Sequence, residues 1–173
     1  AAEIATFNAP SIQLGNSSTG NVTISAQVTV PSGSNLTLVS NGTGSVLSSK
    51  RATTNLTMGA GKTLDVSTLP VIGTTIDGTT LGSGYSQLHV IGDLSIAGKT
   101  LSLSGSYTPA AGNVFTIVEA TNLTGTFTGL TNGSTTTFNG KTLIVNYTST
   151  SVTLTEPSPV VTTNPTNSTV TAS

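Results

Sequence analysis

Apolar and polar residues alternate with a period of two along most of the chain. In the clearest stretch, apolar side chains occupy every second position and are separated by Thr, Ser and Gln: Val22, Ile24, Ala26, Val28 and Val30. Residues 31–34, Pro-Ser-Gly-Ser, end the run with residue types that form turns. Successive side chains of a strand point to opposite faces of a sheet, so this alternation predicts a strand over residues 22–30 with one buried face.

The same pattern recurs in short pieces that are closed by glycine or asparagine. Apolar residues are not spaced at three and four as in an amphipathic helix, and β-branched residues dominate. We therefore predict an all-β protein with short strands. The predicted apolar pairs are Leu36/Leu38, Leu56/Met58, Leu64/Val66, Leu88/Val90, Leu94/Ile96, Leu101/Leu103, Phe115/Ile117, Leu123/Phe127, Leu143/Val145 and Val152/Leu154.

Two architectures are compatible with short strands at this spacing. One is an antiparallel β-sandwich, and the other is a β-solenoid in which each coil of the chain stacks on the previous one. No strict repeat is present, although three segments are similar: Asn21-Val-Thr-Ile, Asn35-Leu-Thr-Leu and Asn55-Leu-Thr-Met. Their separations of 14 and 20 residues are typical of irregular coils, but the spacing alone does not choose between the architectures.

The second half of the chain carries a more specific order of motifs. Residues 88–98 read Leu-His-Val-Ile-Gly-Asp-Leu-Ser-Ile-Ala-Gly, residues 112–117 read Gly-Asn-Val-Phe-Thr-Ile, and residues 125–130 read Gly-Thr-Phe-Thr-Gly-Leu. A closing segment, Leu-Ile-Val-Asn-Tyr at 143–147, is followed by Val-Thr-Leu at 152–154. This order resembles the C-terminal part of autotransporter-associated β-helix repeat proteins, over roughly residues 75–155. The resemblance implies a right-handed parallel β-helix with a small C-terminal β-cap.

The ends of the chain differ in composition from the middle. We predict an N-terminal arm over residues 1–9, a β-solenoid domain with its cap over residues 10–156, and an extended C-terminal tail over residues 157–173, where three prolines would interrupt a central strand. Each end is interpreted either as an extended terminus or as an arm that adds to the sheet of a neighbouring subunit. The residues predicted to join subunits are Ile4, Phe7, Val160, Val161 and Val170.

Charge is scarce, at 6% of residues with a net charge of −1. The five basic residues are scattered, so we expect no binding to nucleic acid, and no apolar run approaches the ~20 residues that cross a bilayer, so we expect no membrane insertion. The chain begins with Ala1-Ala2-Glu3, as a mature secreted chain would, and its surface must be made of hydroxyls and amides. We therefore predict an extracellular or cell-surface location.

Asparagine lies in the acceptor pattern Asn-x-Ser/Thr more often than chance gives. The nine candidate N-glycosylation sites are Asn16, Asn21, Asn35, Asn41, Asn55, Asn122, Asn132, Asn146 and Asn167. An alternative interpretation is structural, since Asn suits the turn that opens a strand and Thr suits the strand itself.

Residues for catalysis are few. The six acidic residues are far apart in sequence, His89 is the single histidine, and cysteine is absent, so we predict no enzyme activity, no metal site and no cofactor. The favoured hypothesis is a secreted structural protein whose partner is itself, in a filament or surface layer joined by strand addition or by stacking of solenoid ends. An adhesin that binds glycan or extracellular matrix is the alternative, and a polysaccharide-active enzyme is less favoured.

Overall fold

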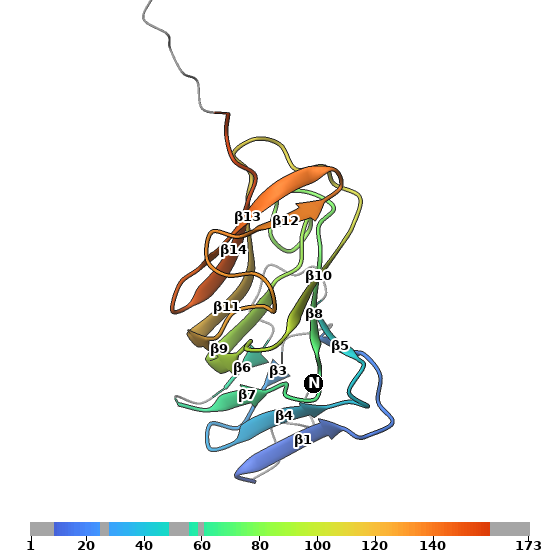
Figure 1. Cartoon of the computed structure of the whole chain (residues 1–173). Helices are drawn as coiled ribbons and strands as arrows, with labels where there is room; N and C mark the ends of the chain where they lie inside the picture. Colours follow the sequence, from blue (N-terminus) through green and yellow to red (C-terminus); the bar gives the residue numbers. More distant parts are fainter. Residues whose placement is uncertain (1–8, 25–27, 49–55, 59–60, 160–173) are drawn as a thin grey trace, which may run out of the picture.

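The computed structural model describes residues 9–24, 28–48, 56–58 and 61–159 (Figure 1), and all of the regular structure in this part of the chain is β-strand. The prediction of an all-β protein is confirmed. The strands are β1 (Ser11–Gly15), β2 (Val22–Ile24), β3 (Val28–Thr29), β4 (Asn35–Val39), β5 (Ser45–Ser48), β6 (Leu56–Thr57), β7 (Thr63–Asp65), β8 (Val71–Thr75), β9 (Leu88–Ser95), β10 (Thr100–Ser104), β11 (Val114–Thr124), β12 (Thr135–Phe138), β13 (Lys141–Tyr147) and β14 (Ser151–Thr155).

The larger sheet is mostly parallel. Its path runs β1-β4-β7-β9-β11, and each strand pairs with one that lies 24 to 30 residues further along the chain. Strands β3 and β6 join the same sheet, because β6 pairs with both β3 and β9. Parallel neighbours cannot be joined by a tight hairpin, so the chain must leave this sheet and return to it between one strand and the next.

The strands of the smaller sheet lie in the segments of chain that connect strands of the larger sheet. It has four parallel strands in the order β10-β8-β5-β2, with Val22 paired to Val46, Val46 to Ile72 and Ile72 to Leu101. The chain therefore visits the two sheets in turn. Among the strand pairings of the described residues, nine are parallel and three are antiparallel, which argues against the alternative of an antiparallel sandwich.

The core consists of apolar side chains that stack in register between successive strands. In the larger sheet, Leu36 pairs with Leu64, Leu64 with Leu94, and Leu94 with Leu123, and all four are buried. Residues on either side of these positions point away from the core, which accounts for the alternation in the sequence. The polar outer face carries the Thr, Ser and Asn that make up much of the composition.

The last strands are antiparallel. Strand β14 lies between β11 and β13, and β12 pairs with β13 as the outermost strand, at the opposite end of the molecule from β1 (Figure 1). Phe115 in β11 is fully buried and packs edge-to-face against Tyr85 and Tyr107, with ring centroids 5.4 and 6.3 Å apart. The Tyr147 hydroxyl donates to the Leu130 carbonyl at 2.8 Å, which ties β13 to the preceding loop.

Two details of the sequence prediction are wrong. The strand predicted over residues 22–30 is two strands, and they lie in different sheets: β2 is in the smaller sheet and β3 is in the larger one. Conversely, Leu88, Val90 and Leu94, which were assigned to two strands, lie on one long strand, β9, and Ile96 follows its end. The alternation continues from β2 to β3, although these strands lie in different sheets, because both sheets face the same core. Alternation therefore does not show where one strand ends and the next begins.

Candidate functional site

The first three strands along the chain, β1, β2 and β3, each have one free edge. In the described part of the chain, β1 pairs only with β4, β2 only with β5, and β3 only with β6. The carbonyl of Pro10 accepts a hydrogen bond from the Asn35 amide at 3.0 Å, so it points toward β4. Along a parallel ladder, alternate residues direct their backbone groups to opposite sides. The N–H and C=O groups of Ser11 and Gln13 therefore point outward, away from β4.

Apolar burial is incomplete at the same end. Leu14, Val22 and Val28 are only partly buried. Their register partners one turn further along, Leu38, Val46 and Leu56, are 2%, 1% and 2% exposed. The apolar side chains are in register on both levels, and among the described strands β1, β2 and β3 each have a neighbour on one side only, which accounts for the difference. We call β1, β2 and β3 together the open end.

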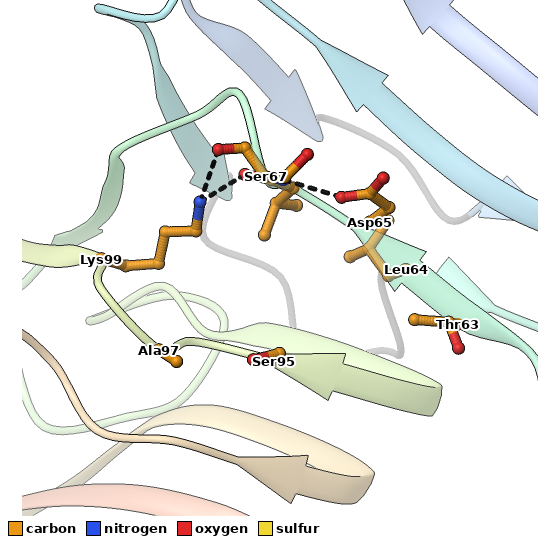
Figure 2. Close-up of a pocket in the computed structure, with 8 residues that line it drawn as sticks. Thr63, Leu64, Asp65, Ser67, Ser95, Ala97 and Lys99 are labelled. Carbon is orange, nitrogen blue, oxygen red and sulfur yellow. Dashed lines mark hydrogen bonds between the residues drawn. The ribbon is translucent and has the colours of Figure 1, made fainter.

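Figure 2 shows a second feature, a polar pocket of about 300 Å³ between β7 and the segment that follows β9. Asp65 lies on one side, and Lys99, which is only 7% exposed, reaches across from the other. The Lys99 ammonium donates hydrogen bonds to the carbonyls of Val66 and Ser67, at 2.7 and 3.0 Å. Lys99 thus connects the segment that follows β9 to the segment that follows β7, beyond the end of the pairing between these two strands.

Burial lowers the pKa of the Lys99 ammonium below its ordinary value, while the negative charge of Asp65 acts in the opposite direction. The folded chain therefore holds this proton less tightly than the unfolded chain does. Between the lowered folded pKa and the ordinary lysine pKa, the unfolded state binds more protons, and the contribution of Lys99 to stability increases as the pH rises.

We expect Lys99→Met to lower the free energy of unfolding by about 1–2 kcal/mol near neutral pH, because two backbone carbonyls lose a charged donor. The difference between the wild-type protein and this variant should widen as the pH rises through the interval between the lowered pKa of Lys99 in the folded chain and the ordinary lysine pKa. Urea unfolding at several pH values measures both effects. Lys62→Met, which is outside the pocket lining, is the control for the removal of a lysine and should lower the free energy of unfolding by less than Lys99→Met. A difference that narrows with pH would contradict the assigned direction.

A neighbouring hollow of about 280 Å³ lies over β7, β9 and β11. Asp93 accepts a hydrogen bond from the Asn122 side-chain amide at 2.6 Å, and the two residues are in register on β9 and β11. Asp65 is not stacked on Asp93, because Asp93 pairs with Thr63. Within the described residues, no three His, Cys, Asp or Glu side chains are grouped so that they could hold a metal ion.

Most of the predicted glycosylation asparagines use their side chains in turns and between strands. The side-chain oxygens of Asn16 and Asn41 accept from amides two residues further on, and those of Asn21, Asn35 and Asn132 accept from the more distant amides of Ser45, Thr63 and Tyr147, at 2.8 to 3.1 Å. Except for the half-buried Asn146, the sequon asparagines of the described residues, which are Asn16, Asn21, Asn35, Asn41, Asn122 and Asn132, are exposed. Asn55 and Asn167 lie outside the described residues.

The residues predicted to join subunits, Ile4, Phe7, Val160, Val161 and Val170, also lie outside the described residues. The open end was not identified from the sequence. The signal that could have indicated it is the uncharged stretch from residue 4 to residue 49, which contains no Asp, Glu, Lys, Arg or His. An edge strand without charge lacks a common protection against pairing with another chain.

Comparisons of the chain with known protein families, with curated proteins and with solved structures found no match. In the described part of the chain, no helix could cross a lipid bilayer.

Proposed function

We propose that the protein is a secreted structural subunit that assembles with copies of itself into an extracellular filament or surface layer. The observation that carries this proposal is the open end, where the strand edges have no further neighbour among the described residues and the apolar columns are partly exposed. Because such edges are templates for pairing with another chain, a protein that keeps one exposed and uncharged is suited to assembly.

The proposed architecture is a right-handed parallel β-helix closed by a C-terminal β-cap. Two features support it: the chain visits two parallel sheets in turn, and the last strands are antiparallel. Four of the five motif segments that resemble autotransporter-associated β-helix proteins overlap β9, β11, β13 and β14, and the fifth, residues 125–130, follows β11. In this arrangement the cap would protect one end of the stack and leave the other end available for assembly.

Two further elements belong to the proposal. The terminal arms, with Ile4 and Phe7 at one end and Val160, Val161 and Val170 at the other, would add as strands to neighbouring subunits. Glycans on the exposed sequon asparagines would cover the outer face without disturbing the core, because these side chains lie on the surface. An outer face made of hydroxyls, amides and glycans suits an extracellular location.

An adhesin is the second candidate function. The observation that favours it is the pair of hollows over β7 and β9, one lined by Asp65 and Lys99 and the other by Asp93, in a chain with few charges. Such groups can bind the hydroxyls of a glycan. The ring contacts of Tyr85, Tyr107 and Tyr147 with phenylalanines, however, engage these tyrosines in packing rather than in a stacking surface for sugars.

Negative-stain electron microscopy tests the structural proposal on the full chain and on versions that lack residues 1–9 or residues 157–173. The expected result is filaments or sheets for the full chain and their loss in at least one truncated version, with circular dichroism as the control for folding. The proposal fails if the full chain forms no ordered assembly over a wide range of concentration. Binding to a glycan array without assembly would instead favour the adhesin.

A further inference from the structure

The two ends of the larger sheet are different, and this difference limits how copies can stack. At one end β1 is the edge of a parallel sheet over partly exposed apolar columns. At the other end β12 is the outer strand of an antiparallel hairpin, and its own Phe138 is buried. A subunit with one open end and one closed end cannot stack indefinitely through open ends alone, because two open ends that meet leave only closed ends exposed.

The sequence of β1, Ser-Ile-Gln-Leu-Gly, is suited to pairing with itself. In an antiparallel pair centred on Gln13, each Gln13 faces its copy, and Ser11 faces Gly15. The outward backbone groups of Gln13 and Ser11 would then find partners. Ile12 of one copy would lie on the core side beside Leu14 of the other, so the apolar columns would continue across the junction.

Charge does not oppose this contact. Every described residue from Ala9 to Ser48 is uncharged, so two open ends meet without repulsion. In the single chain, the Gln13 side-chain amide donates to the Gly15 carbonyl at 3.2 Å, at the edge where a pairing strand would lie. This bond occupies an acceptor that a neighbouring strand would otherwise use, and it must open when the strand adds.

We propose that the open ends of two copies pair about a two-fold axis at Gln13, with β1 antiparallel to β1 of the second copy. The resulting dimer is the unit from which a larger assembly is built, and the closed ends and terminal arms make the remaining contacts. This inference deepens the proposed function by naming the partner of the open end. The dimer itself does not depend on the proposed function, whereas its role as the unit of a larger assembly does.

Gln13→Pro tests the pairing directly. Proline removes the outward N–H of Gln13 and leaves the bonds toward β4 in place, because those bonds use the backbone of residues 10, 12 and 14. Two symmetric hydrogen bonds are lost per dimer, so the dimer dissociation constant should rise about 30-fold or more. Gln13→Thr keeps the N–H and is the matched control. Thermal unfolding monitored by circular dichroism shows whether each variant folds.

Sedimentation velocity gives the result. The proposal predicts a species of twice 17.2 kDa for the wild-type chain and for Gln13→Thr, and a monomer for folded Gln13→Pro at the same concentration. A wild-type monomer at all concentrations, or a Gln13→Pro dimer of unchanged affinity, would overturn it. Dimers without filaments would support this inference and contradict the proposed function. Filaments that are unaffected by Gln13→Pro would do the reverse.

Cysteine cross-linking fixes the orientation even if Gln13→Pro does not fold. The chain contains no cysteine, so Gln13→Cys and Thr137→Cys, on the exposed edge of β12, each introduce a single thiol. With a short bis-maleimide, two-fold pairing predicts cross-linked dimers of Gln13→Cys alone. Cross-links only in a mixture of the two variants would show head-to-tail stacking and would exclude the two-fold contact.

Discussion

Replacement of Phe115 by alanine is expected to lower the free energy of unfolding by about 3–5 kcal/mol. Phe115 is fully buried in the part of β11 that pairs with the antiparallel β14, just before the part that pairs with the parallel β9, and it contacts Tyr85 and Tyr107 edge-to-face. Removal of the ring would leave a cavity between the parallel stack and the antiparallel strands, which the surrounding strands could fill only in part.

Urea unfolding of Phe115→Ala measures this cost, with Val114→Ala as the neighbouring control. Val114 is 53% exposed, so its truncation should change the free energy of unfolding by no more than about 0.5 kcal/mol. A loss below about 1 kcal/mol for Phe115→Ala would show that the ring is not packed in the core as described.

Gly125→Ala should be the second strongly destabilising change, at about 2–4 kcal/mol. Gly125 has a φ of +81°, and a Cβ at this position would lie 2.6 Å from the backbone nitrogen of Ala97 and 2.7 Å from its Cα. The backbone of the preceding turn would have to move, because both of these atoms belong to the main chain. The adjacent hydrogen bond from the Ile96 amide to the Thr124 carbonyl, at 2.9 Å, would be strained with it.

Gly129→Ala separates the cost of the positive φ from the cost of the close contact with another segment of backbone. Gly129 has a similar φ of +75°, but no heavy atom lies within 4 Å of an added Cβ. It should therefore cost only the conformational penalty, about 1–2 kcal/mol. Thermal or urea unfolding of both variants gives the comparison. Equal losses would mean that the turns containing Ala97 and Gly125 are not in close contact.

The sequence predicts the all-β class and most of the buried positions, because alternation reports directly which side chains face a core. Leu36, Leu64 and Leu94 were identified in this way, and all are buried. Alternation fails at corners, where β2 and β3 were predicted as one strand. It also missed β5 and β8, in which small or polar residues such as Ser48 and Thr74 are themselves buried and no apolar pair is left to recognise.

The candidate sites are less predictable, since they depend on which strands become neighbours. Nothing in the local sequence places Lys99 beside the carbonyls of Val66 and Ser67, more than 30 residues earlier in the chain. The open end likewise follows from pairing order. Leu14 and Leu38 have the same alternation in sequence, but among the described strands β4, which carries Leu38, has a neighbour on both sides, whereas β1, which carries Leu14, has one neighbour. The local sequence does not distinguish the two residues, because both lie in the uncharged stretch from residue 4 to residue 49.

Self-association through the open end is the central claim, and sedimentation velocity of the unmodified full chain over a wide range of concentration tests it most directly. We expect a concentration-dependent increase in mass from 17.2 kDa to at least twice that value. A single 17.2 kDa species at every concentration, with the fold intact by circular dichroism, would contradict it.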